Sequence, residues 1–530
     1  YKRQDEQSAP PAPDEQQSSP DEWGLIEEED EPVVPRPRRR RRRPRRDPLG
    51  MARFACKVLL PALCAKADAV DSDHLEDLDK ETLQQLAGPE AGKSVVAPSV
   101  IRQAVGKDLD AWILAASVEH DSFLEKEAVV EATPADIKAY GKRPLPMLNV
   151  WSRTTEDVRK CRSCIAGNFQ KLDPAAQRWT AQAEPGSIFA AAKLAALRGW
   201  EISKHGVKGA FVNAPLPDSE LILVEPPRQW KDWGIVGKHV VWRLQKAVYG
   251  LRQSPKWWSD KRDADLRQLK TKVAGKEYFL RQNEADSQVW TICNDDQQLL
   301  GVVCVYVDDF LVMAPKGEVR TAMVNAITSL WTFGTARTLS PTTSLTFLGI
   351  DWSMKANGDI VLSQERFVQE LLTKYNMAKC NPTKAITLDK PPGMADVPTP
   401  DALTELQAYA GSFNWLATRT RPDLAYYVSL LASCATKQAA WSRDLAHKVL
   451  RYLAGTAQAT LTMSAQGDEN DMKIYTDAGF AGPDTKYQNG LVICWGGSSI
   501  TWRSSRGALS ALSTAEAELC SAALGWQVGE

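Results

Sequence analysis

Residues 299–314 read LLGVVCVYVDDFLVMA and contain the feature that decides the fold. Two adjacent carboxylates, Asp308 and Asp309, interrupt an apolar run that is rich in β-branched residues. Apolar, β-branched runs of this length are typical of buried strands. The sequence therefore predicts two strands joined by a tight turn, with the two aspartates at the turn of the hairpin.

A carboxylate pair beside a buried hairpin needs a positive charge, because burying bare carboxylates is costly. A hard divalent cation such as Mg²⁺ supplies that charge through oxygen ligands. The pair therefore suggests a two-metal site for phosphoryl transfer, in which the ions stabilise the attacking and leaving oxygens. The alternative is a solvated Asp-Asp turn. Turn statistics alone favour the metal site and the solvated turn about equally.

The composition is that of an ordinary globular protein. The chain has 530 residues, of which 43% are hydrophobic and 25% charged, and its formal net charge is −1. This length suffices for several domains. No apolar run reaches the ~18 residues that a membrane span needs, and no secretory signal is recognisable. The ten cysteines are scattered, with Cys161 and Cys164 as the only CxxC pair, so we expect reduced thiols and an intracellular protein, cytoplasmic or nuclear.

The first 105 residues differ in composition from the rest. Residues 1–50 are rich in Pro, Gln, Ser and Glu, and we expect them to be disordered. An acidic cluster at 27–31 precedes an arginine-rich run at 36–46. That run is either a nuclear-localisation or nucleic-acid-binding segment or a solvated charged tail. Residues 51–105 are expected to link this tail to the folded part.

From residue 111 onward, strand-like and helical patterns alternate, which predicts an α+β fold. An amphipathic helix is expected first, at 111–132, and a proline-rich linker at 381–400. The remaining expected elements are strands at 221–224, 240–242 and 289–293, helices at 257–269, 366–375, 403–416 and 440–453, and strands followed by a helix within 473–520.

Residues 306–310, YVDDF, resemble the catalytic hairpin of reverse transcriptases. Further segments resemble the polymerase region of copia-type LTR retrotransposon Pol polyproteins, in the order of that family. These segments are KAVYGLRQSPKWW (246–258), FLGI (347–350), LSQ (362–364), TRPD (420–423) and RYLAGT (451–456). Such ordered matches, running from about Ala111 to the C-terminus, are far more specific than any single motif.

The resemblance implies a right-hand polymerase followed by the start of an RNase H-like domain. Fingers and palm would occupy 106–385, a thumb or connection 386–465, and a truncated α/β RNase H-like domain 466–530. The implied activity is RNA-directed DNA polymerisation with Mg²⁺ or Mn²⁺. The implied partners are deoxynucleoside triphosphates and an RNA or DNA template with its primer. The chain begins at Tyr1 rather than Met, so we expect a fragment of a longer polyprotein or a truncated gene model.

In this resemblance Asp308 and Asp309 are the metal-binding catalytic carboxylates. The basic stretch at 159–165 corresponds to a fingers strand, where alternation places Lys160 and Arg162 on one face. The planar guanidinium of Arg162 would hold phosphate oxygens. The alternative is a solvated basic edge strand.

Three more residues are implied in nucleotide binding. Phe211, within VKGAFVNAPL (207–216), falls where the family places an aromatic ring under the incoming sugar, which would exclude a ribose 2′-hydroxyl. Its alternative is an ordinary core aromatic. Gly250 and Ser254 fall in the stretch that positions template and nucleotide.

The main departure from the family is Gly206, which stands where the family has an aspartate that binds both metals. Neighbouring residues are poor substitutes. Glu201 is an odd number of residues away and would face the other side of a strand, His205 is a poor ligand for a hard metal, and Asp218 lies beyond a proline turn. We therefore predict that this copy polymerises poorly or not at all.

The C-terminal part resembles RNase H in YTDAGF (475–480) and LSALSTAEAEL (509–519), with Asp477 and Glu518 as catalytic metal ligands. Ser513 and Glu516 have the spacing of a capping box, which gives Glu516 a structural role. The family's other carboxylates lie further along the fold, so we expect an incomplete site without RNase H activity.

Two other functions stay open. A nucleic-acid-binding protein with a lapsed active site would bind a duplex without metal, with a steep salt dependence. A pseudogene product would fail to fold into a soluble protein. The oligomeric state does not follow from the sequence.

Overall fold

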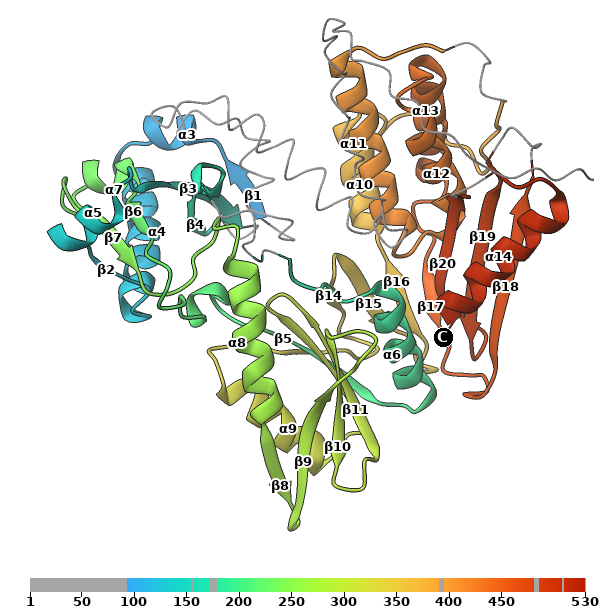
Figure 1. Ribbon diagram of the computed structural model, residues 1–530, viewed down its shortest axis with the longest axis horizontal. Coiled ribbons are helices and arrows are strands. Elements are labelled where there is room, and N and C mark those ends of the chain that lie inside the picture. Colours follow the sequence, from blue (N-terminus) through green and yellow to red (C-terminus); the bar gives the residue numbers. More distant parts are fainter. Residues whose placement is uncertain are drawn as a thin grey trace, which may run out of the picture. The chain divides into compact units, whose positions relative to one another are not determined.

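The computed structural model describes residues 93–154, 157–171, 177, 179–389, 395–480, 486–507 and 510–529. These residues form a mixed α/β protein (Figure 1), as the alternating patterns predict. The expectations for the tail at 1–50, its arginine-rich run, and the first part of the linker, 51–92, lie outside the described residues.

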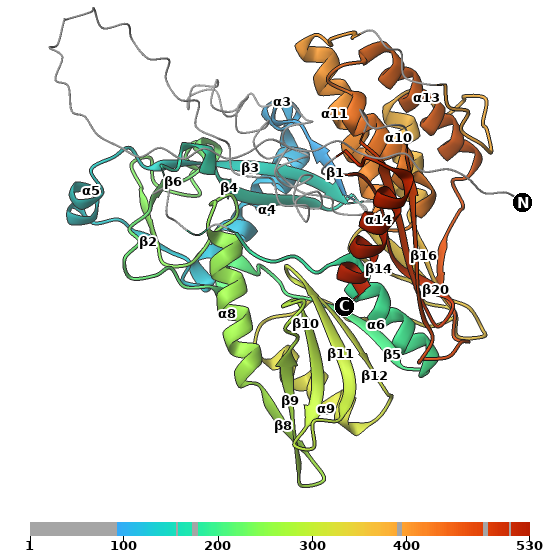
Figure 2. The same cartoon turned by 45° about the vertical axis from the view of Figure 1, so that its right-hand side comes forward.

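The predicted hairpin is the centre of a seven-stranded antiparallel sheet with the order β13-β5-β12-β11-β10-β9-β8. Figure 2 labels all strands of this sheet except β13. Every neighbouring pair in it is antiparallel. Its strands are β5 (Glu201–Gly206), β8 (Lys270–Val273), β9 (Lys276–Gln282), β10 (Val289–Asn294), β11 (Leu299–Tyr306), β12 (Asp309–Ala314) and β13 (Arg337–Thr338). The helices that pack on it are α6 (Pro185–Leu197), α8 (Ser254–Gln268) and α9 (Glu318–Ser329).

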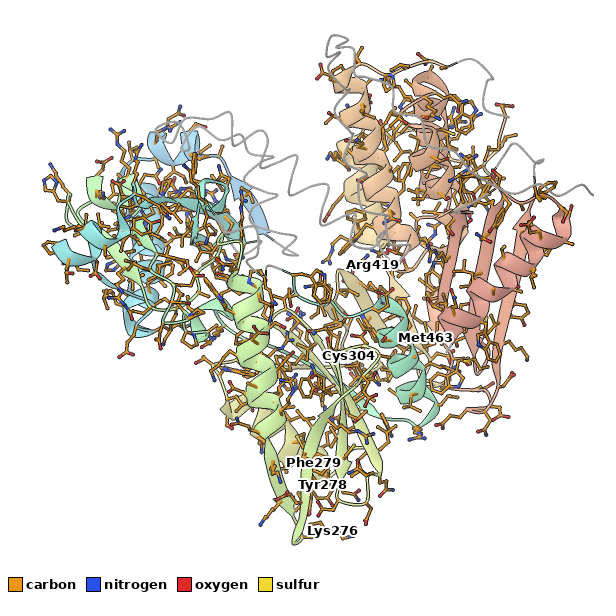
Figure 3. All side chains as sticks on the ribbon, in the orientation of Figure 1. Lys276, Tyr278, Phe279, Cys304, Arg419 and Met463 are labelled. Carbon is orange, nitrogen blue, oxygen red and sulfur yellow. The ribbon has the colours of Figure 1, made fainter. Side chains whose placement is uncertain are left out.

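The two faces of this sheet pack against different helices, because side chains alternate along each strand. Cys304 and Leu311 belong to the buried cluster that contains residues of α6, and we call this side the α6 face. Val303 and Phe310 belong to the cluster that contains residues of α8 and α9, the α8 face. Cys304, labelled in Figure 3, is completely buried. Both faces of the hairpin are therefore covered, which explains its continuous apolar run.

A second sheet has the order β1-β3-β6-β7-β2, with β4 paired to β3. Its strands are β1 (Lys93–Val96), β2 (Val129–Glu131), β3 (Leu145–Thr154), β4 (Arg159–Ile165), β6 (Leu223–Glu225) and β7 (Trp242–Leu244), and the short helices α3 (Pro98–Gln103), α5 (Pro134–Tyr140) and α7 (Arg228–Asp232) accompany it. Ordered structure thus begins before residue 106, and the domain boundary predicted there stays a prediction.

The helix predicted at 111–132 is wrong at both ends. The structure has α4 (Gly106–Glu125) and then the strand β2. Glu127 takes a left-handed backbone conformation (φ 49°), which ends the helix. The β-branched Val129 and Val130 pair with β7 instead, because strand pairing outweighs an apolar spacing that is compatible with either element.

After β13, the described residues form two small sheets and five α-helices. A four-stranded sheet comprises β14 (Leu345–Phe347), β15 (Ile350–Met354), β16 (Ile360–Ser363) and β17 (Leu461–Met463), where Met463 is labelled in Figure 3. The helices are α10 (Glu365–Lys374), α11 (Pro400–Ala417), α12 (Ala425–Cys434), α13 (Ala439–Gly455) and α14 (Thr514–Gly529), and the last sheet comprises β18 (Met472–Gly479), β19 (Gln488–Trp495) and β20 (Ser498–Arg506).

The other element predictions are confirmed to within a few residues. The strands predicted at 221–224, 240–242 and 289–293 correspond to β6, β7 and β10, and the helices predicted at 257–269, 366–375, 403–416 and 440–453 to α8, α10, α11 and α13. In the predicted linker, residues 381–389 and 395–399 form no helix or strand. None of the described helices combines the length and the apolar character needed to cross a membrane.

Candidate active site

The carboxylate pair lies at the tip of the β11–β12 hairpin. Tyr306 and Asp309 are the last Cα partners of the two strands, so Val307 and Asp308 form the turn. Val307 has a left-handed backbone conformation, with a φ of 55°. This conformation is costly for a β-branched residue and persists only where surrounding contacts hold it.

Two side chains of α8 hold this turn. The indole Nε1 of Trp258 donates a hydrogen bond to the Val307 carbonyl at 2.8 Å, and the guanidinium of Arg262 donates to the same oxygen at 3.4 Å. Both side chains are almost fully buried, at 1% and 2% exposure. Sequence reasoning missed Arg262; the available signal was its position one helical turn after Trp258.

Gly206 lies directly opposite Asp309. The two residues are Cα partners in the β5–β12 pair, and the Val207 amide donates to the Asp308 carbonyl at 2.9 Å. Among the described residues other than its chain neighbours, a Cβ added at Gly206 would have only the Oδ1 atom of Asp309 within 4 Å, at 3.1 Å. A carboxylate at position 206 would therefore project beside the carboxylate pair.

Three residues near Gly206 in the sequence have side chains that could bind a metal, but none of them can take the place of the missing carboxylate. Glu201 forms an ion pair with Arg320 of α9, with Oε1 and Nη1 2.6 Å apart. His205 is buried and its Nε2 lies 2.9 Å from the Ser203 hydroxyl. These residues alternate with Ile202, which is on the α6 face, so they face the other side, as predicted. Asp218 is exposed in the loop before β6.

The two carboxylates have different charged neighbours. Burial raises the pKa of Asp308 from 3.8 to about 6, and the Asp309 charge adds to the rise. Burial also raises the pKa of Asp309, whereas the Lys204 ammonium lowers it by its charge and a hydrogen bond. The Nζ of Lys204 lies 2.8 Å from Asp309 Oδ2. The charges of Arg162 and Lys204 also lower the pKa of Asp308. No role for Lys204 was predicted from the sequence.

Asp308→Asn is expected to stabilise the chain at pH 8 by about 1–3 kcal/mol when a chelator is present. Because the pKa of this carboxyl is raised on folding, its ionised form destabilises the folded state. That cost is fully present above pH ~6 and disappears as the pH falls below ~4, where the unfolded chain is protonated too. Urea unfolding at pH 8 and pH 4 measures the difference.

The matched control is Asp296→Asn, in the exposed turn between β10 and β11, which is expected to change stability little at either pH. An unchanged or lower stability of Asp308→Asn at pH 8 would contradict the assignment of a buried, destabilising carboxylate to the hairpin turn.

Near this hairpin, an aromatic and cationic cluster joins three segments of the chain. The guanidinium of Arg162 on β4 lies over the ring of Tyr249, 4.7 Å from its centroid. The ring of Phe211 meets Tyr249 edge to face at a centroid distance of 4.9 Å. Burial raises the pKa of Tyr249 to about 12, and the charge of Asp308 contributes. Arg162 and Phe211, predicted from distant segments, are thus brought together by Tyr249, which sequence reasoning did not assign.

The other predicted nucleotide-binding residues differ in their surroundings. Lys160 is exposed on β4. Gly250 has a φ of 94°, and a Cβ there would collide with the Ile165 carbonyl at 1.9 Å, so only glycine fits. Ser254 is fully buried at the start of α8, and its hydroxyl donates to the Val248 carbonyl at 2.7 Å. Any effect of Ser254 on a nucleotide would therefore act through the shape of this turn.

The residues present do not fit a two-ion centre. Within the described part of the chain, no three His, Cys, Asp or Glu residues converge as a metal-binding group. The site has two carboxylates, and one oxygen of Asp309 already contacts an ammonium group. The CxxC cysteines are free thiols, and burial raises the pKa of Cys164 to about 12, which disfavours the thiolate that a metal requires.

The two acids predicted at the C-terminal site lie on adjacent elements. Asp477 is on β18 and Glu518 on α14, and the Ser521 hydroxyl of α14 donates to the Asp477 carbonyl at 2.8 Å. The Ser513 hydroxyl accepts from the Glu516 amide at 3.2 Å, and the Glu516 carboxylate accepts from the Leu512 amide at 2.6 Å. The Ser513 half of the predicted capping box is therefore present, whereas the Glu516 carboxylate binds the amide of Leu512 rather than that of Ser513. The metal-binding roles of Asp477 and Glu518 stay predictions.

Comparison with known proteins identifies the relatives of this chain. Residues 137–389 match the family described as "Reverse transcriptase (RNA-dependent DNA polymerase)". The Pol polyprotein of transposon TNT 1-94 from Nicotiana tabacum is 27% identical over 63% of this chain, and that of transposon RE2 from Arabidopsis thaliana 29% over 62%. A putative transposon Ty5-1 protein of Saccharomyces cerevisiae is 26% identical over 57% of this chain and 92% of its own length. These relatives confirm the resemblance predicted from the motifs.

The chain spans only 24% and 21% of the lengths of the first two relatives. Among solved structures, a foamy viral protease-reverse transcriptase in complex with dsDNA matches with a TM-score of 0.41 and 13% identity, over 76% of this chain and 68% of that one.

Proposed function

We propose that this chain, whose residues 137–389 belong to the reverse transcriptase family, is the polymerase region of a copia-type retrotransposon Pol polyprotein and that glycine at position 206 impairs its DNA synthesis. The reaction of an intact site would join a primer 3′-hydroxyl to the α-phosphate of a deoxynucleoside triphosphate, copying an RNA or DNA template. Divalent cations, Mg²⁺ or Mn²⁺, supply charge stabilisation to such a reaction when they are bound.

The observation that carries this proposal is the register of three backbone positions. Gly206 is the cross-strand partner of Asp309, and Asp308 is the adjacent turn residue. Three separate sequence positions thus meet at one end of the sheet, where a carboxylate on each would form one charged cluster. The chain retains two of the three carboxylates.

The aromatic and cationic cluster supports the choice of a nucleotide as substrate. Arg162 lies over the ring of Tyr249, and its charge lowers the pKa of Asp308. A guanidinium in that position would bind phosphate oxygens in its planar fork. The ring of Phe211 meets that of Tyr249 edge to face, and a ring at this position would restrict the space available to a ribose 2′-hydroxyl.

A second candidate, a nucleic-acid-binding remnant without catalysis, is favoured by one observation. The Asp309 carboxylate forms an ion pair with Lys204, so the charge of the site is partly compensated by the chain itself. Such a remnant would keep the fold and its duplex-binding surface while the site no longer reacts.

The test combines two measurements on the purified chain. We expect it to bind a primer–template duplex in fluorescence anisotropy, losing affinity on the order of tenfold or more between 50 and 200 mM salt. We expect little or no primer extension by the same sample. Extension at a rate close to that of Gly206→Asp would contradict the impairment. Binding by both chains with extension by neither would favour the remnant.

The C-terminal acids lead to a weaker proposal of the same kind. Asp477 and Glu518 would be the ligands of an RNase H-like site, and among the described residues no third ligand converges with them. We therefore expect no cleavage of an RNA–DNA hybrid by this chain.

A further inference from the structure

We propose that Lys204 is an internal counter-cation for the carboxylate pair, and that it opposes divalent cation binding independently of Gly206. This inference rests on the proposed function and extends it, because it assigns a second disabling residue to the same site. The family implies a centre that binds two divalent cations, whereas this chain presents two carboxylates, one of which already contacts the Lys204 ammonium.

The position of Lys204 follows from the strand register. Lys204 and Gly206 are two residues apart on β5 and therefore project on the same face. Their cross-strand partners are Leu311 and Asp309, and Leu311 lies on the α6 face. The lysine side chain is thus placed on the side toward which Asp309 projects, two residue pairs along the strands from the Gly206–Asp309 pair.

The two oxygens of Asp309 have different neighbours. Oδ2 lies 2.8 Å from the Lys204 ammonium, which is the distance of a charge-assisted hydrogen bond. Oδ1 is the atom nearest to where a Cβ at position 206 would project. Both side chains of the ion pair are 26% exposed. The ammonium is therefore partly withdrawn from water. Its charge is screened less there than it would be at the protein surface.

A second cation strengthens the preference of Lys204 for the carboxylate. Arg337 on β13 is the cross-strand partner of Lys204 on the other side of β5. Like charges directly opposite each other on a sheet repel. Asp309 is therefore the favourable direction for the ammonium.

A divalent ion that used Asp309 Oδ2 would have to displace this ammonium and then remain close to it. Both steps oppose binding, since the ammonium loses its partner and like charges are brought together. An aspartate placed at position 206 would add a ligand near Oδ1 without removing the ammonium from Oδ2. Gly206→Asp alone is therefore expected to restore cation binding only in part.

The experiment measures Mn²⁺ binding by electron paramagnetic resonance for four full-length chains: the chain as it is, Lys204→Gln, Gly206→Asp and K204Q/G206D. Glutamine keeps a polar side chain of similar length without the charge. We expect K204Q/G206D to bind Mn²⁺ at least about tenfold more tightly than Gly206→Asp. Lys276→Gln in the Gly206→Asp background is the matched control, since Lys276 is exposed at the distant β8–β9 turn (Figure 3), and it is expected to leave the affinity unchanged.

Thermal unfolding in the presence of a chelator gives a second readout that needs no metal. Removing the ammonium leaves Asp309 without its partner, so Lys204→Gln is expected to lower Tm by about 2 °C or more, whereas Lys276→Gln is not. An unchanged Tm would mean that the Lys204 ammonium does not stabilise the Asp309 carboxylate in the folded chain, which would overturn the inference.

Equal Mn²⁺ affinity of K204Q/G206D and Gly206→Asp would also overturn it, because the ion pair would then be purely structural. Primer extension by Gly206→Asp reports separately on the proposed function. If that variant extends a primer but the two affinities are equal, the proposed function stands and the role of Lys204 falls. If no variant binds Mn²⁺ more tightly than the chain as it is and Gly206→Asp does not extend a primer, both fall.

Discussion

Gly206→Asp is expected to raise the rate of single-nucleotide incorporation by at least about 10³-fold over the chain as it is. The physical reason is the loss of a carboxylate at the point where charge must be stabilised. Metal-based stabilisation of such a transition state is worth several kcal/mol, and each 1.36 kcal/mol corresponds to tenfold in rate. The added Cβ would lie 3.1 Å from the Oδ1 atom of Asp309, so the Asp309 carboxylate must shift by a few tenths of an ångström to admit the side chain.

The higher incorporation rate of Gly206→Asp is expected to depend on the carboxylate of Asp308. Adding Asp308→Asn to Gly206→Asp is expected to abolish extension, because it removes a carboxylate from the same cluster. Gly206→Asn is the matched control for size, since it fills the same space without the charge and is expected to remain inactive. Equal activity of Gly206→Asn and Gly206→Asp would show that backbone restriction, rather than a metal ligand, is what the chain lacks.

Arg262→Met is expected to destabilise the chain by about 3–5 kcal/mol, the largest stability effect that we predict for a single substitution. The guanidinium is buried and donates to Asp263 Oδ1 at 2.6 and 2.9 Å, and to Gln288 Oε1 at 2.7 Å. Methionine fills much of the volume but leaves the Asp263 carboxylate buried without its cation. It also removes one of the two donors to the strained Val307 turn.

Urea unfolding monitored by tryptophan fluorescence measures this loss. The double variant Arg262→Met/Asp263→Leu is expected to recover most of it, because replacing both members of a buried ion pair with apolar groups is often nearly neutral. Arg281→Met, at an exposed arginine on β9, is the surface control and should change stability by no more than about 0.5 kcal/mol. If Arg262→Met also changed the free energy of unfolding by no more than about 0.5 kcal/mol, the buried hydrogen bonds of Arg262 would not hold the hairpin.

The hairpin could be predicted from the sequence because one local pattern indicates both strands and the turn. An apolar run interrupted by two acids predicts both strands and the turn, and the structure confirms them as β11 and β12. The opposite orientation of Glu201 and Gly206 also followed from strand alternation and is confirmed by the Glu201–Arg320 ion pair. These features depend on local periodicity, which is visible in one segment at a time.

The contacts that determine the charge of the site could not be predicted in the same way. The Lys204–Asp309 ion pair depends on the register between β5 and β12, which are about a hundred residues apart in the chain. The support of Val307 by Trp258 and Arg262 depends on how α8 packs across the hairpin. The helix predicted at 111–132 was wrong for a related reason, because β2 forms only through pairing with the distant β7.

The most direct test of the central claim is the location of Mn²⁺ by anomalous diffraction in crystals of the Gly206→Asp variant with a primer–template duplex and a deoxynucleoside triphosphate. We propose that positions 206, 308 and 309 form one cation-binding cluster, in which the chain as it is lacks one carboxylate. The predicted result is an anomalous peak about 2.1 Å from carboxylate oxygens at position 206 and of Asp308 or Asp309. A Mn²⁺ peak elsewhere, with the carboxylate at position 206 directed away from Asp309, would contradict the account.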